Sequence, residues 1–346
     1  MPGYIYPGKT WLDDEGKPIH AHGGSIMNVN GKYYWYGENK EKTVPGSGIW
    51  HWGVRCYSST DLCSWHDEGL ILPPDTENPD SPIHPSQCMD RPHILFCEKT
   101  GKYVMWIKIM GKDGIQRMAV FISSSLLSGY EMLRYYRPLD MSSGDFDLVK
   151  DSSGKAYIYF ERVHTDMICA ELSDDYTDVN GKYSVHFPNG QPPFVREAPA
   201  FFKKDDKMYL FTSGTTGYFP NPSEVACAND YHGPWKVLGD PHVDMPGKDS
   251  YCSQITSVFH VPGTKLYIAL ADRWLTDLPE NMPDVRRVFE CWFDPKGSRP
   301  VAPEDDPNNY TEQNTSKATY VWLPVEFENG IPVLHWYDKW SPVDFM

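Results

Sequence analysis

A polar side chain stands ten to twelve residues before each of five lysines that recur along the chain. The five polar residues are His22, Asp90, Asp145, Glu197 and Gln254, which precede Lys32, Lys102, Lys155, Lys207 and Lys265. If equivalent positions met in one space, the three carboxylates would repel and desolvate one another, which raises the pKa of at least one. A carboxyl that stays neutral beside an ionised one can protonate a glycosidic oxygen. The pattern therefore indicates a pocket that cleaves glycosidic bonds.

Each lysine belongs to a short repeat in which a turn with Gly or Asp leads into an aromatic strand. The copies span residues 31–36, 101–106, 154–159, 206–211 and 263–268. An apolar run precedes each copy, so each predicts a β-hairpin. Successive lysines are 70, 53, 52 and 58 residues apart, which leaves room for two more strands per interval. Four-stranded sheets repeated radially form a β-propeller. We therefore predict an all-β, five-bladed β-propeller, although five unrelated hairpins of a sandwich are the alternative.

In a propeller, the first strand of each blade runs beside the central channel. The five polar residues would therefore converge on the axis. We treat residues 1–346 as one catalytic domain. Residues 294–317 are rich in Pro, Asp, Asn and Ser and predict a long surface loop. Residues 318–346 contain a hairpin around Asn329-Gly330 and are expected to close the ring.

The net charge of −15 disfavours nucleic acid and anionic lipid as partners. No apolar stretch is long enough to span a membrane, and residues 1–4 do not start a signal peptide. We expect a soluble monomer, secreted or periplasmic, whose signal peptide is absent from this sequence. The eight cysteines form no CxxC pair, which disfavours structural zinc.

Several aromatic residues are candidates for stacking on sugar faces at the rim of the pocket, although packing in the core or between blades is the commoner role for any one of them. They are Trp35, Trp50, Trp52, Trp106, Tyr218 and Trp274.

Short motifs through most of the chain resemble the five-bladed propellers of glycoside hydrolase family 43, in particular its exo-β-1,3-galactanase branch. The motifs are Ala21-His22-Gly23-Gly24, Tyr34-Trp35-Tyr36-Gly37-Glu38, Asp90-Arg91-Pro92, Ser143-Gly144-Asp145, Arg196-Glu197-Ala198-Pro199-Ala200, Thr212-Ser213-Gly214-Thr215-Thr216-Gly217, Ser253-Gln254 and Tyr320-Val321-Trp322-Leu323-Pro324.

The resemblance implies that Glu197 is the general acid and that Asp145 orients it and tunes its pKa. Most of the family carries an Asp general base where this chain has His22, and the galactanase branch shares that absence. There the residue that matches Gln254 is proposed to contact the attacking water. A carboxylate, Asp90 or Glu38, is the alternative proton acceptor, acting directly or through Gln254.

The resemblance also implies that Glu38 hydrogen-bonds hydroxyls of the terminal sugar. The other candidates for substrate binding are Asp90, His22 and Thr215, with the aromatic residues Trp106, Tyr218 and Trp274 from the set above. The branch usually has Glu where this chain has Asp90, which is one methylene shorter. No cofactor is required. Family members sometimes carry calcium on the axis, so a structural Ca²⁺ is an expectation here, although no ligand spacing demands one.

The predicted function is that of an inverting, exo-acting glycoside hydrolase that releases galactose from the β-1,3-galactan of arabinogalactan. Two alternatives keep the same fold. One is an α-L-arabinofuranosidase or a β-galactofuranosidase, because a few hydroxyl contacts distinguish these sugars. The other is a carbohydrate-binding propeller without catalytic activity.

Overall fold

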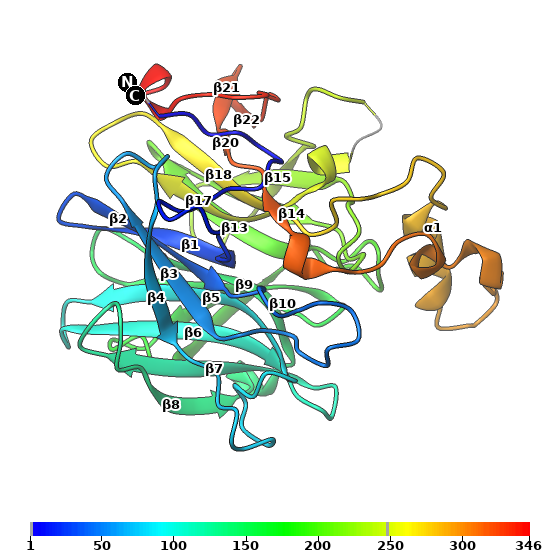
Figure 1. Ribbon diagram of the computed structural model, residues 1–346, viewed down its shortest axis with the longest axis horizontal. Coiled ribbons are helices and arrows are strands. Elements are labelled where there is room, and N and C mark those ends of the chain that lie inside the picture. Colours follow the sequence, from blue (N-terminus) through cyan, green and yellow to red (C-terminus); the bar gives the residue numbers. More distant parts are fainter. Residues whose placement is uncertain (1–2, 247–248) are drawn as a thin grey trace.

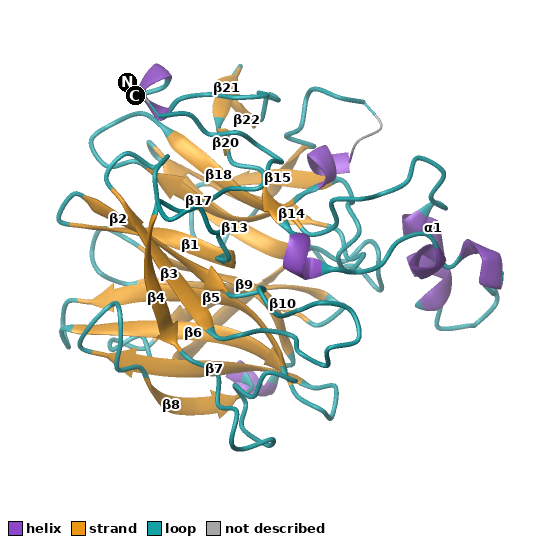
Figure 2. Cartoon of the chain, in the orientation of Figure 1, coloured by secondary structure: helices purple, strands orange, loops and turns teal. Residues whose placement is uncertain are grey.

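The computed structural model describes residues 3–246 and 249–346. Five small antiparallel sheets form a five-bladed β-propeller, as the repeat predicts (Figure 1). The innermost strand of each sheet packs against that of the next, and the fifth packs against the first, so the ring is closed. Strands fill the body of the molecule, and helical segments are few and peripheral (Figure 2).

Each of the first four blades is built from four strands that follow one another in the chain. Blade 1 contains β1 (His22–Val29), β2 (Lys32–Glu38), β3 (Val54–Ser59) and β4 (His66–Leu72). Blade 2 contains β5 (Cys88–Cys97), β6 (Lys102–Met110), β7 (Gln116–Ser123) and β8 (Glu131–Tyr136). Blade 3 contains β9 (Ser143–Lys150), β10 (Ala156–Arg162), β11 (Asp166–Leu172) and β12 (Val179–His186). Blade 4 contains β13 (Glu197–Lys204), β14 (Lys207–Ser213), β15 (Ser223–Ala228) and β16 (Lys236–Gly239).

The fifth blade is interrupted by a long insertion. Its strands are β17 (Gln254–His260), β18 (Tyr267–Arg273), β19 (Thr319–Tyr320) and β20 (Leu323–Pro324). The insertion between β18 and β19 contains the helix α1 (Val285–Trp292), which the sequence pattern did not predict. Within residues 294–317, three 3₁₀ turns cover Pro303–Asp305, Pro307–Asn309 and Thr315–Lys317.

A bulge near the start of each innermost strand sets the direction of the polar side chains. Strand pairing shifts register between His22 and Ser25, between Asp90 and His93, and between Glu197 and Ala200. Similar shifts occur near the starts of β9 and β17. A bulge twists a strand and redirects its side chains. Because the same irregularity occurs in every blade, it affects the direction of the side chains around one end of the central channel.

The two ends of the chain join at the edge of the ring (Figure 1). Ile5 pairs with Trp340 in an antiparallel bridge, and Nε1 of Trp340 donates to the Trp322 carbonyl at 2.8 Å. A short hairpin, β21 (Glu326–Glu328) and β22 (Ile331–Val333), precedes this contact. The terminal segments thus hold blade 1 against blade 5 by packing, without exchanging a strand.

No helix among the described residues is long and apolar enough to cross a membrane. All eight cysteines are free thiols.

Candidate active site

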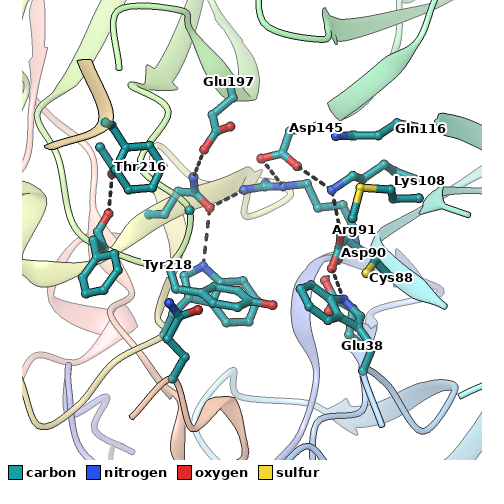
Figure 3. Close-up of a pocket in the computed structure, with 18 of the residues that line it drawn as sticks. Glu38, Cys88, Asp90, Arg91, Lys108, Gln116, Asp145, Glu197, Thr216 and Tyr218 are labelled. Carbon is teal, nitrogen blue, oxygen red and sulfur yellow. Dashed lines mark hydrogen bonds and ion pairs between the residues drawn. The ribbon is translucent and has the colours of Figure 1, made fainter. Parts of the chain in front are cut away.

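A cavity of about 320 Å³ opens at the end of the channel where the innermost strands begin. Four of the five polar residues line it: Asp90, Asp145, Glu197 and Gln254. Figure 3 labels the three carboxylates among them. Each comes from a different blade, so the radial repeat brings together groups that lie far apart in the sequence. Glu38, at the end of β2, joins them.

The fifth polar residue, His22, does not reach the cavity. Its side chain is fully buried, with Nδ1 2.8 Å from Oδ1 of Asp272 and Nε2 3.2 Å from the hydroxyl of Tyr320. Its ring stacks on Tyr320 and lies 5.5 Å from that of Trp274, centroid to centroid. The expectation that His22 contacts sugar is wrong, because Trp274 lines the cavity and His22 supports that ring from the protein interior.

Arg91, from blade 2, contacts residues of three other blades at the cavity. Its Nη2 donates to Oε1 of Gln254 at 2.6 Å, and its Nε lies 2.9 Å from Oδ2 of Asp145. Its backbone N–H donates to Oε1 of Glu38 at 2.9 Å. Arg91 has a φ of 52°, an uncommon conformation outside glycine that turns its N–H toward Glu38. The guanidinium thus fixes the amide of Gln254, whose Nε2 donates to Oε1 of Glu197 at 3.1 Å.

Glu197 has the environment of a general acid. Burial raises the pKa of its carboxyl well above the usual value, and the nearby charges of Asp145 and Glu161 raise the pKa further. Arg91 and Lys108 act in the opposite direction without cancelling the effect. Glu197 therefore stays protonated at a pH where an exposed glutamate would be ionised.

Two lysines, Lys40 and the largely buried Lys108, neutralise the other side of the cavity. Nζ of Lys108 is 2.6 Å from Oδ2 of Asp90 and 3.8 Å from Oδ1 of Asp145. Nζ of Lys40, which is fully buried, is 2.7 Å from Oε2 of Glu38 and 3.9 Å from Oδ1 of Asp90. Such charges are tolerated inside a protein because they are paired.

The pKa values of Asp90 and Glu38 are shifted in opposite directions by burial and by the charges around them. Burial alone would raise the pKa of Asp90, but the ammonium groups of Lys108 and Lys40 outweigh it, and the pKa falls below its usual value. Burial raises the pKa of Glu38, and the charge of Asp90 adds to this effect. Lys40 and the N–H of Arg91 oppose the shift without offsetting it. Glu38 is therefore the more basic of the two carboxylates.

An aromatic wall formed by Trp50, Tyr218 and Trp274 lines the cavity beside these charges. Tyr218 stacks on Trp50 with ring centroids 5.9 Å apart and meets Trp274 at 5.2 Å. Nε1 of Trp50 donates to Oδ1 of Asp90 at 2.8 Å. Apolar rings beside fixed hydrogen-bonding groups are typical of sugar sites, in which the rings face C–H groups and the polar groups bind hydroxyls.

Two other expected sugar contacts do not line the cavity. Trp106 is fully buried between blades 2 and 3, and its Nε1 donates to the Tyr176 carbonyl at 2.8 Å, so its expected role in stacking is wrong. Thr215 is buried and its hydroxyl donates to the Val195 carbonyl at 3.0 Å, while its neighbour Thr216 lines the cavity.

Lys40, Lys108 and Arg91 were not among the residues that the sequence pattern indicated as candidates for chemistry. Lys108 interrupts an otherwise apolar strand, residues 103–110, and a charge in such a strand is a signal of a buried pair. Lys40 lies in the turn after β2 and carries no comparable signal. Arg91 directly follows Asp90 within a motif of the resemblance, but the repeated offset from the lysines selects only one residue in each blade.

Arginine or lysine pairs with the carboxylates of Glu38, Asp90 and Asp145, and the carboxyl of Glu197 accepts from Gln254. Within residues 3–246 and 249–346, no group of three or more His, Cys, Asp or Glu side chains is placed to hold a metal ion. This donor set does not fit calcium, and the structural Ca²⁺ suggested by the resemblance stays a prediction without support from these contacts.

Comparison with known proteins places this geometry in a family. The model of the glycosyl hydrolases family 43 matches residues 17–272. Among solved structures, a family 43 β-1,3-galactosidase has a TM-score of 0.80 at 29% identity, and the match covers 100% of this chain and 65% of that one. A second β-1,3-galactosidase, in complex with galactodeoxynojirimycin, has a TM-score of 0.79 at 29% identity, covering 97% and 100%.

An exo-β-1,3-galactanase from Clostridium thermocellum has a TM-score of 0.74 at 26% identity, with 97% of this chain and 66% of that one covered. The chain thus spans about two thirds of the length of the first and third of these proteins. No curated protein matched the sequence significantly. Because the family model covers most of the sequence and the propeller aligns along its length, the chain belongs to glycosyl hydrolase family 43.

Proposed function

We propose that this chain is an inverting, exo-acting glycoside hydrolase that releases galactose from β-1,3-galactan. The observation that carries the proposal is the carboxyl of Glu197, buried at the cavity with a raised pKa and held by Gln254. A binding pocket would gain little from such an acid, whereas hydrolysis needs one. The family 43 neighbours, which include two β-1,3-galactosidases and an exo-β-1,3-galactanase, support the choice of sugar and linkage.

In this mechanism, Glu197 protonates the glycosidic oxygen while water attacks the opposite face of the sugar. Asp145, held by Arg91, stays close to Glu197 and keeps its pKa high. The aromatic wall and the groups around Asp90 and Glu38 bind the terminal sugar. The sugar acquires positive charge in the transition state, which the surrounding carboxylates stabilise.

Glu38 is the best of the three candidates for the general base. The oxygen of Gln254 already accepts a short hydrogen bond from a permanently charged guanidinium, which makes it a weak proton acceptor. Asp90 has a lowered pKa and is correspondingly a weak base. Glu38 has a raised pKa and lines the same cavity. A pKa near the working pH favours proton transfer in catalysis.

The proposal is tested by galactose release from β-1,3-galactan with the unaltered enzyme, Glu197→Gln and Glu77→Gln, an exposed control. Loss of the acid should lower kcat by about 10²- to 10⁴-fold, and the control should match the unaltered enzyme. Detection of the α-anomer of galactose as first product would establish inversion. Monomeric state and secretion stay predictions.

Aryl α-L-arabinofuranosides and β-galactofuranosides are assayed in parallel. If only a furanoside is cleaved, the assignment of Glu197 as the acid is retained and the proposal of galactan as the substrate is overturned. Binding of galactan with no turnover of any substrate would favour the carbohydrate-binding alternative and reduce Glu197 to a ligand.

A further inference from the structure

The helix α1 lies against blades other than the one that carries it in sequence. It belongs to the insertion of blade 5, yet Nε2 of Gln191, between blades 3 and 4, donates to the Glu290 carbonyl at 3.4 Å. Phe293, which caps the helix, meets the ring of His164 in blade 3 edge-on, with centroids 5.4 Å apart. The helix therefore lies against blade 3 and against the connection that leads into blade 4, whose innermost strand begins at Glu197.

The packing of Phe289 fixes α1 to the loop that follows β14. A Cβ on Gly217 would lie 3.8 Å from Cζ of Phe289, which is van der Waals contact. Phe289 and Tyr218 both pack against the buried cluster formed by Phe219, Trp274, Leu275 and Ala318. This cluster joins the insertion to the aromatic wall of the cavity.

Trp292 lines the same cavity and is nevertheless 44% exposed. Its ring lies 5.1 Å from that of Phe289, so one side is supported by the protein. Asn308 and Gln313, from the second half of the insertion, also line this part of the cavity. A large exposed aromatic ring beside two amide side chains offers one surface for the C–H face of a sugar and groups for its hydroxyls.

The position of the acid decides which part of the substrate this surface meets. A general acid protonates the oxygen that leaves with the aglycone, so the leaving sugar lies on the side of Glu197. The groups around Asp90 and Glu38 lie across the cavity from Glu197 (Figure 3). Because α1 packs on the loop that follows β14 in blade 4, Trp292 is on the leaving-group side.

We propose that Trp292 stacks on the galactose unit next to the bond that is cleaved, with the amides of Asn308 and Gln313 beside it. The inference rests on the proposed function and adds a leaving-group subsite to it. The insertion of blade 5 would then select substrates by the sugar unit attached to the terminal galactose, whereas the end of the channel binds the terminal galactose itself.

The test compares two substrates that share the terminal sugar. β-1,3-Galactotriose fills the leaving-group side, whereas β-galactosyl fluoride has only a fluoride there. We expect Trp292→Ala to lower kcat/KM for the triose about five- to tenfold more than for the fluoride. Trp292→Phe, which keeps a ring, should recover most of the difference.

Tyr183→Ala is the control, because Tyr183 is an exposed aromatic on the outermost strand of blade 3 and does not line the cavity. Its ratio of triose to fluoride activity should equal that of the unaltered enzyme. Equal losses on both substrates in Trp292→Ala, or the same ratio change in Tyr183→Ala, would overturn the subsite. Failure of the unaltered enzyme to cleave either substrate would instead overturn the proposed function, and this inference with it.

Discussion

The amide of Gln254 donates to Oε1 of Glu197 at 3.1 Å, which ties a side chain from blade 5 to the proposed acid on blade 4. The same Nε2 donates to Oγ of Ser213 at 2.9 Å, and the oxygen accepts from Arg91. With both ends of the amide engaged, Gln254 serves as a positioning residue for the acid.

Gln254→Glu should lower kcat on the order of 10²-fold, because a carboxylate cannot donate to Glu197. The added negative charge should also raise the pKa of Glu197 and move the basic limb of the pH–kcat profile to higher pH. Rates measured across pH on galactan check this, with Gln254→Ala to separate the lost donor from the added charge. A gain in kcat would mean that position 254 contacts the attacking water as a base.

Asp145→Asn should move the basic limb of the pH–kcat/KM profile to lower pH. Glu197 must be protonated to act, so activity falls as pH rises through the pKa of Glu197. Burial and the charge of Asp145 both raise that pKa, and removing the charge should lower it. Asp151→Asn, in the exposed turn of the same blade, should leave the profile unchanged, and an unmoved limb in Asp145→Asn would contradict the assignment.

Glu38→Gln should remove the acidic limb of the pH–kcat profile. A general base must be ionised, so activity falls as pH decreases through the pKa of Glu38, which burial raises. In the variant the rate should drop by about 10²-fold or more and lose its dependence on pH on the acidic side. An acidic limb that persists in Glu38→Gln would transfer the role to Asp90.

Lys108→Met should destabilise the fold as well as the site. It leaves Asp90 with Lys40 as its remaining cation, at 3.9 Å, and breaking a buried ion pair costs about 3–5 kcal/mol. Unfolding in urea measures this loss at neutral pH. Lys102→Met, at the start of the same strand, removes a lysine that hydrogen-bonds to Ser124 at the surface and should change stability by less than about 1 kcal/mol.

Trp340→Ala should open the joint between blades 1 and 5. The ring is buried in the cluster that holds Ile5, Trp35 and Trp322, and its loss should cost about 3–5 kcal/mol. Thermal unfolding checks the prediction. Trp336→Ala, which removes a half-buried ring near Tyr251, should cost much less, and equal effects would mean that the joint has no special role.

The repeat in the sequence was sufficient to predict the propeller, because turns and aromatic strands are local patterns. Lys32, Lys102 and Lys207 begin β2, β6 and β14, Lys155 directly precedes β10, and Lys265 lies two residues before β18. The convergence of Asp90, Asp145, Glu197 and Gln254 followed from the radial symmetry. The helix α1 was missed because it is short and lies in a segment rich in turn-forming residues.

Tertiary structure alone decided which side chains face the cavity. His22 has the expected offset, but its ring points into the protein interior, where it contacts Asp272, and a bulge follows it in the strand. The distance in sequence from a repeat lysine does not predict the direction of a side chain. Trp106 shares its residue type with Trp274, yet its neighbours in blade 3 bury it. Lys40 meets Asp90 only because two blades are adjacent. Residue type and spacing thus predicted the fold and the group of carboxylates at the cavity, and the family resemblance singled out Glu197 among them, whereas the pairing of charges across blades depended on contacts that sequence patterns do not encode.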